Sequence, residues 1–215
     1  MILHNKIDAQ LPSWRSRVTT LLKEHGDKVA GEITISQIYG GMRSAKVLVT
    51  DISFVDPEEG IRFRGHTLPV VLEKLPKPKG AEMPYVGGLY YLLMIGEFPT
   101  EEQALEVEAE WAKQSAVPDH VFKVLRDMPK DTHPMALFSQ AILTLQGESE
   151  FAKRYAEGMS KMALWRPALD DAMYLTSKLG VSAAFIYRLK YGDKGEILNE
   201  YISKNPIPKT TVITQ

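Results

Sequence analysis

Apolar residues recur along residues 165–186 at gaps of three and four, and this spacing predicts one long amphipathic helix. The stripe consists of Trp165, Leu169, Ala172, Leu175, Leu179, Ala183 and Ile186. A second apolar set lies off the stripe and consists of Met173, Val181, Ala184, Phe185 and Leu189. We therefore expect the C-terminal half of this helix to be enclosed on two sides. Pro167 either begins the helix or kinks a helix that began at Ser160.

Shorter apolar patterns predict a mainly α chain of about eight helices. One covers residues 11–24, with Pro12 in its first turn. Another begins at Thr100, whose spacing to Gln103 matches a capping box. A further helix follows His133, and its inner face is expected to consist of Met135, Phe138, Ile142 and Leu145. The one β pattern lies at about 46–65, where a turn over residues 56–60 separates two alternating runs and predicts a small β-hairpin.

The composition argues against several classes of protein. Lysine and arginine total 26 against 27 acidic residues, with no basic block, so nucleic acid is not an expected partner. The absence of cysteine excludes disulfides and thiolate chemistry. The five histidines are scattered, so we expect no metal centre. Charged residues interrupt the long helix too often for a membrane span, and residues 1–10 show no secretory or transit signal.

Five short motifs occur in order along the chain: Ile38-Tyr-Gly-Gly-Met-Arg43, Asp56-Pro-Glu-Glu-Gly-Ile-Arg-Phe-Arg-Gly65, Gly96-Glu-Phe-Pro-Thr-Glu-Glu-Gln103, His133-Pro-Met135 and Phe151-Ala-Lys-Arg-Tyr-Ala-Glu-Gly158. Together they resemble the N-terminal, helical part of eukaryotic-type citrate synthase. This resemblance implies a citrate-synthase-like large-domain helical bundle with a small β-hairpin. It also implies a helical domain over residues 1–191 and a divergent, extended tail over residues 192–215.

The resemblance implies a homo-dimer or hetero-oligomer built through the helices at 134–146 and 161–191. In the family, the catalytic histidines and aspartate come from the half beyond the position of residue 191, so we expect no catalytic residue and no required cofactor in this chain. The first hypothesis is a non-catalytic, structural component of a larger assembly in the mitochondrial matrix. The alternative is one part of an active citrate synthase, which makes citrate and coenzyme A from acetyl-coenzyme A and oxaloacetate, with its remaining half on another chain or missing.

Two residues match family positions that contact coenzyme A, as a substrate or vestigial ligand. Arg43 matches an arginine that contacts the phosphates, and Lys161 stands where the family has a second arginine. Ser44 and Val47 replace glycines of the family's loop, which would restrict the approach of a ligand to the backbone. The structural alternatives are a surface or interface salt bridge for Arg43 and a solvated helix start for Lys161. A third hypothesis, a regulatory coenzyme A binder, depends on these two residues alone.

Other charged residues have simpler structural explanations than catalysis. The cluster of Asp56, Glu58, Glu59, Arg62 and Arg64 is expected to form turn and hairpin-surface charges. His133 is expected to start a helix. Asp170 and Asp171 are expected to interact with the positive end of their own helix, in its first turn after Pro167.

Overall fold

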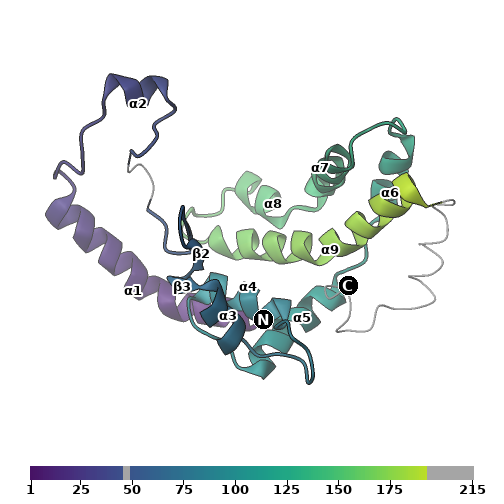
Figure 1. Ribbon diagram of the computed structural model, residues 1–215, viewed down its shortest axis with the longest axis horizontal. Coiled ribbons are helices and arrows are strands. Elements are labelled where there is room, and N and C mark those ends of the chain that lie inside the picture. The colour runs from purple at the N-terminus through teal and green to yellow at the C-terminus, as the bar shows by residue number, and fades with distance from the viewer. Residues whose placement is uncertain (46–48, 193–215) are drawn as a thin grey trace. The chain divides into compact units, whose positions relative to one another are not determined.

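The computed structural model of the chain describes residues 1–45 and 49–192. These residues form two compact units, Met1–Ala104 and Leu105–Gln215, and each unit is described by itself. Both are built mainly of helices (Figure 1), which confirms the predicted fold class. The predicted tail lies outside the described residues except for Gly192, so its boundary stays a prediction.

The first unit combines helices with a small sheet. Its elements are α1 (Ile2–His25), α2 (Ile35–Tyr39), β1 (Ser53–Asp56), β2 (Gly60–Phe63), β3 (His66–Thr67), α3 (Leu68–Lys74), α4 (Val86–Ile95) and the first turn of α5 (Glu101–Lys113). The capping box predicted for α5 is present, because Thr100 Oγ1 accepts from the amide of Gln103 at 3.3 Å and the Gln103 side chain accepts from the amide of Thr100 at 2.9 Å. Gly96 ends α4 in the left-handed conformation at φ 85°.

The predicted hairpin is confirmed and carries one more strand. β1 and β2 pair antiparallel, with Asp56 opposite Gly60, and β2 pairs in turn with β3. The Asp56 side chain accepts from the amides of Glu58 and Glu59, each at 2.9 Å, and so closes the turn between the strands. β1 begins at Ser53, later than the predicted run that started at residue 46.

The first helix is longer than its sequence pattern predicts. α1 begins at Ile2, and Pro12 lies inside it rather than in its first turn. A proline within a helix removes one backbone hydrogen bond. The residues before Pro12 compensate by packing, since α1 contacts α4 and Leu3 is fully buried. Tertiary burial therefore overrides the local proline signal.

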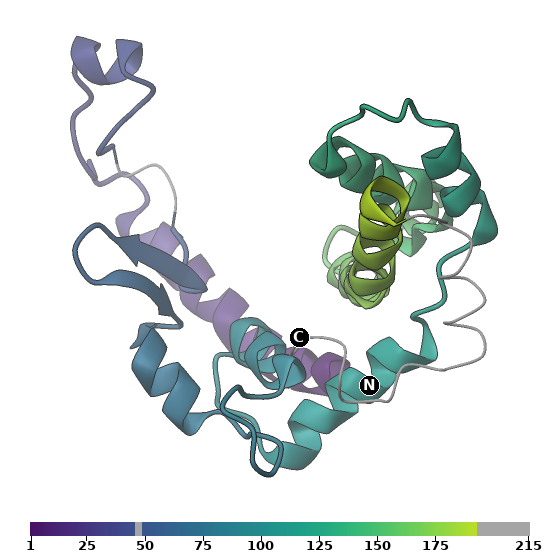
Figure 2. The same cartoon turned by 45° about the vertical axis from the view of Figure 1, so that its right-hand side comes forward.

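The second unit is formed by helices around one core. Its elements are the rest of α5, α6 (Asp119–Asp127), α7 (Pro134–Thr144), the 3₁₀ turn η1 (Leu145–Glu148), α8 (Glu150–Ala156) and α9 (Trp165–Tyr191). Figures 1 and 2 show α7 and α8 beside the long α9, and both helices contact it. The core lies where α6, α7 and α9 meet, with Val121, Leu137 and Phe185 at its centre.

The long C-terminal helix is confirmed, and its buried residues come from both predicted apolar sets. The stripe supplies Leu169 and Ile186 and the second set supplies Met173, Val181 and Phe185, whereas Leu175 and Leu179 are half-buried and Ala183 and Ala184 are exposed. Both sets are apolar, so periodicity alone does not identify the face that covers the core. α9 begins at Trp165 after turns at residues 161–164, which places Pro167 in the first turn, where no intrahelical partner is needed.

The predicted inner face of α7 is also partly wrong. Leu137, Ala141 and Leu145 pack into the core, but Met135 is 62% exposed. Phe138 and Ile142 are half-buried. The structure thus turns α7 so that part of its apolar surface faces away from the core of its own unit.

Candidate functional site

Arg43 lies in a short loop that follows the five-residue helix α2. Thr34 caps this helix by accepting from the amide of Gln37 at 3.2 Å, and Gln37 Oε1 accepts from the amide of Thr34 at 2.9 Å. The loop folds back on the helix, because the amide of Met42 donates to the carbonyl of Gln37 and Gln37 Nε2 donates to the carbonyl of Arg43 at 3.1 Å. The backbone of Arg43 is therefore fixed by a locally capped helix.

The backbone on both sides of Arg43 adopts the left-handed conformation. Met42 has φ 60° and Ser44 has φ 62°, and each costs about 1 kcal/mol relative to ordinary backbone because neither is glycine. Ser44, which stands where the family has a glycine, adopts the left-handed backbone that glycine favours, and its effect on the approach of a ligand stays a prediction. Val47 lies outside the described residues.

The side chain of Arg43 is exposed, and its guanidinium makes no hydrogen bond or ion pair within residues 1–45 and 49–192. A surface salt bridge of Arg43 is thus absent from the described contacts, and an interface salt bridge stays a prediction. An arginine with a fixed backbone and free donors can bind a phosphate or carboxylate in two-point fashion.

Lys161 belongs to the second unit and is exposed in the turns that connect α8 to α9. Asp171 of α9 accepts hydrogen bonds from the start of α8 and so links the two helices on either side of this connection. Its carboxylate accepts from Ser149 Oγ at 2.5 Å and from the amides of Glu150 at 2.8 Å and Phe151 at 3.2 Å. Lys161 therefore lies in a connection whose two flanking helices are fastened to each other.

These contacts correct the interpretation of Asp171. It lies in the second turn of α9 rather than the first, and it caps the N-terminus of α8, not that of its own helix. The principle that a carboxylate is stabilised at a positive helix end holds, but the helix is a different one. Sequence spacing could not show this, because the partner is 20 to 22 residues away.

The charges around the hairpin are structural, although one of them is not at the surface. Arg62 pairs with Glu59 across the turn. The Arg64 side chain is only 15% exposed, pairs with Asp51 at 3.0 Å, and donates to the carbonyl of Leu93 at 2.9 Å. Arg64 thereby satisfies the last turn of α4, a role that its position in the hairpin did not reveal.

Three histidines make structural contacts. His133 caps α7 as predicted, since its Nδ1 accepts from the amide of Met135 at 3.2 Å. The His66 ring packs against Phe98 with centroids 4.9 Å apart, and His120 Nε2 lies 3.4 Å from the carbonyl of Thr144. Within the described part of the chain, no group of three or more histidine or carboxylate side chains could hold a metal ion.

A buried lysine in α9 was not singled out as a site by the sequence pattern. Lys178 is 1% exposed, donates to the carbonyl of Gln114 and lies over the ring of Tyr174 at 3.3 Å. Burial lowers the pKa of Lys178. Burial also raises the pKa of Tyr174, whose hydroxyl donates to Glu148 at 2.6 Å. This network fastens α9 to the end of α5.

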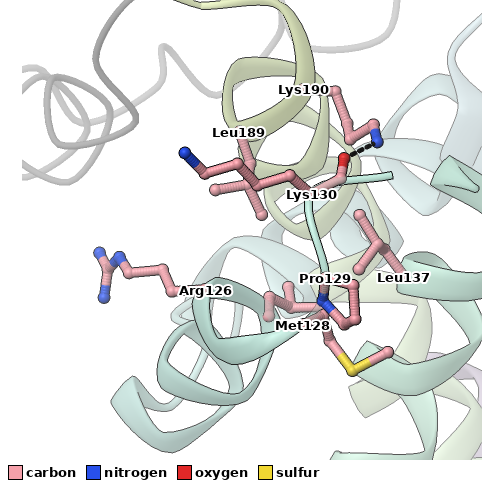
Figure 3. Close-up of a pocket in the computed structure, with 8 residues that line it drawn as sticks. Arg126, Met128, Pro129, Lys130, Leu137, Leu189 and Lys190 are labelled. Carbon is pink, nitrogen blue, oxygen red and sulfur yellow. Dashed lines mark hydrogen bonds between the residues drawn. The ribbon is translucent and has the colours of Figure 1, made fainter. Parts of the chain in front are cut away.

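A hollow of about 270 Å³ lies in the second unit beside the last turn of α9. It is lined by Leu125, Arg126, Met128, Pro129, Lys130, Leu137, Leu189 and Lys190 (Figure 3). Lys190 Nζ donates to the carbonyls of Lys130 and Thr132, and the Arg126 guanidinium lies 5.2 Å from the centroid of the Phe185 ring. Two of its cations therefore already have protein contacts, and Arg43 and Lys161 are not among its lining residues.

The outward surfaces of α7 and α9 are rich in apolar and small side chains. On α7, Met135 and Leu143 are 62% and 67% exposed. On α9, Gly180, Ala183 and Ala184 are exposed, and the rings of Tyr187 and Tyr191 follow them with centroids 5.2 Å apart. None of the described helices has the length and apolar character needed to cross a bilayer.

Comparison with known proteins agrees with the resemblance in the motifs. Residues 41–207 match the protein family described as "Citrate synthase, C-terminal domain". The mitochondrial citrate synthase of Saccharomyces cerevisiae is 45% identical over 183 residues, which cover 85% of this chain and 38% of that protein. Those of Xiphias gladius and Aspergillus niger are 44% and 46% identical, over 87% and 86% of this chain and 40% and 39% of their own lengths.

The chain thus spans about two fifths of the length of these relatives. The family match includes both Arg43 and Lys161 and extends across both units. With the helical architecture, the ordered motifs and this match in agreement, the chain belongs to the citrate synthase family.

Proposed function

We propose that this chain is a structural, dimerising component of a citrate-synthase-type assembly and that it associates through α7 and α9. The observation that carries the proposal is the apolar outward surface of these two helices. A helix that packs only on its own core exposes mainly polar side chains on its other side. From Gly180 onward, α9 exposes Gly180, Ala183, Ala184 and two tyrosines, with Arg188 as the one exposed charged residue. Small residues let a second helix approach closely, and tyrosines are enriched at protein interfaces.

The partner is a second copy of this chain or a longer chain of the same family, because an isologous interface needs the same surface on both sides. We extend to this chain the mitochondrial location that the names of its relatives state. No cofactor is required for association. We carry over coenzyme A, as a substrate or as a vestigial ligand, as the proposed ligand of Arg43 and of Lys161, each within its own unit.

A non-catalytic role is supported by the contacts of the histidines. His66, His120 and His133 contact a ring, a backbone carbonyl and a backbone amide, respectively. An acid or base catalyst needs a ring nitrogen within reach of a substrate proton. The contacts of His120 and His133 engage a ring nitrogen, which supports a structural role for these two residues.

The experiment that tests association is sedimentation equilibrium of the purified chain and of Ala183→Arg. A bulky cation on the small-residue surface should shift the wild-type dimer to a monomer. Ala112→Arg is the matched control, because Ala112 is also exposed on a helix but lies on α5. A wild-type chain that stays monomeric both alone and mixed with a longer chain of the family, or an Ala183→Arg variant that remains dimeric, would contradict the proposal.

A second candidate is that the chain forms part of an active citrate synthase, and the 44–46% identity to three such enzymes favours it. The test is release of free thiol from acetyl-coenzyme A and oxaloacetate after mixing with candidate partner chains. Activity that falls on Arg43→Ala would establish this candidate over the structural role. No activity in any mixture would leave the structural role in place.

A further inference from the structure

Gln37 uses both ends of its side-chain amide. Its Oε1 accepts from the amide of Thr34 at 2.9 Å and completes the capping box of α2. Its Nε2 donates to the carbonyl of Arg43 at 3.1 Å. The same residue thus joins the start of the helix to the residue that carries the free guanidinium.

α2 buries almost no apolar surface that could stabilise it. Ile35, Ile38 and Tyr39 are 75%, 62% and 90% exposed, and no residue of α2 is buried. Figures 1 and 2 show α2 standing apart from the other helices of its unit. Its order within the chain depends on local hydrogen bonds, and the capping box supplies them.

The loop after α2 holds Arg43 in a strained backbone. Of the three non-glycine residues with positive φ in the described part of the chain, Met42 and Ser44 are the two that flank Arg43. Strained backbone persists only where other contacts impose it, and it gathers at sites that must hold a fixed geometry. Within the described residues, the Gln37 amide donates to the Arg43 carbonyl, and the amides of Met42 and Ala45 make the backbone hydrogen bonds of the loop.

We infer that Gln37 is a positioning residue for Arg43, holding its backbone so that the guanidinium is presented to an anionic ligand. The inference deepens the proposed function, because it rests on Arg43 contacting coenzyme A phosphates. Gln37 does not touch the ligand in this arrangement and acts through Arg43. The rival explanation is that Gln37 serves only the start of α2.

Two substitutions separate these explanations. Gln37→Glu keeps the oxygen that accepts from Thr34, since glutamate fills this position of a capping box as well as glutamine does, but it has no donor for the Arg43 carbonyl. Thr34→Ala removes the cap and leaves the donor to Arg43 in place. If Gln37 serves only the start of α2, Thr34→Ala should loosen the helix and the loop after it, and Gln37→Glu should change neither.

The first readout is the mobility of residue 43 itself. The chain has no cysteine, so a single spin label can be attached at Arg43→Cys, and at Glu59→Cys in the hairpin turn as a control. Gln37→Glu should narrow the electron spin resonance spectrum of the label at 43 and leave that at 59 unchanged. Thr34→Ala should narrow the spectrum of the label at 43 less than Gln37→Glu does. An unchanged label at 43 in Gln37→Glu would overturn the inference.

The second readout is a double-mutant cycle for coenzyme A binding, measured by calorimetry on the whole chain. Gln37→Glu should weaken binding about fivefold, the factor that one hydrogen bond supplies, and should add no further loss in the Arg43→Ala background. An equal loss in both backgrounds would mean that the new negative charge acts directly on the ligand, and it would refute a role through Arg43. If the wild-type chain binds no coenzyme A, the ligand part of the proposed function fails, and the spin label still decides the role of Gln37.

Discussion

Asp171→Ala is expected to destabilise the second unit by releasing α8 from α9. The carboxylate accepts three hydrogen bonds, from the Ser149 hydroxyl and from the first two amides of α8. Loss of a capping side chain costs about 1–2 kcal/mol, and loss of a negative charge at a helix N-terminus costs about 0.3–1 kcal/mol more. We expect the free energy of unfolding to fall by about 2 kcal/mol.

Urea unfolding followed by far-ultraviolet circular dichroism measures this change. Asp171→Asn is the graded control, because it keeps one acceptor oxygen and loses the charge, and it should cost about half as much. Ser149→Ala removes the donor of the same hydrogen bond. The losses in the free energy of unfolding caused by Asp171→Ala and by Ser149→Ala should therefore not add in the double variant. If Asp171→Ala unfolds within about 0.5 kcal/mol of the wild type, which is the range of ordinary surface substitutions, the capping role is refuted.

Three further predictions follow from local geometry. Ser44→Gly should raise the free energy of unfolding in urea by about 0.5–1 kcal/mol, because Ser44 has φ 62°, and a loss of stability would contradict this. Hydrogen bonds from the amides of Glu59 and Glu58 lower the pKa of Asp56 below its ordinary 3.8. The ionised Asp56 should therefore stabilise the hairpin fully above pH 3.8, and this stabilisation should be lost as the pH falls through the lowered pKa. A two-dimensional NMR titration should show a chemical-shift change of the hairpin amides at that pH in the wild type and none in Asp56→Asn. Burial lowers the pKa of Lys178 below its ordinary 10.5, so between these two values the unfolded chain binds a proton that the folded chain does not. The free energy of unfolding should therefore rise with pH from the lowered pKa up to about 10.5. Urea unfolding at several pH values measures this rise, which should be smaller in Lys178→Met.

The hydrophobic pattern could predict the helices but not the faces that they bury. The pattern predicts α9 over its full length, yet the buried residues come from both apolar sets: Leu169 and Ile186 from the regular stripe, and Met173, Val181 and Phe185 from the second set. A helix that is apolar on two sides gives the same periodicity whichever side covers the core. Lys178 illustrates the same limit, because its ammonium donates a hydrogen bond to a carbonyl 64 residues away.

The site could be predicted in part. The motif that ends in Arg43 identifies the loop, and the Thr-x-x-Gln spacing at residues 34–37 is a local signal for its cap, equal to the one at residues 100–103. The left-handed backbone at Met42 and Ser44 has no such signal, because neither residue favours it. Asp171 and Arg64 act on helix ends far along the chain, which spacing alone cannot show.

The most direct test of self-association through α9 is the distance between spin labels attached to Arg188→Cys, an exposed position at the end of the small-residue surface. The chain has no cysteine, so each molecule carries one label and any dipolar coupling must join two molecules. Our account predicts a short, narrow distance distribution for labels at 188, and a longer one for labels at Lys123→Cys on the exposed side of α6. A chain that shows no coupling at 188, or a shorter distance at 123, would contradict self-association through α9.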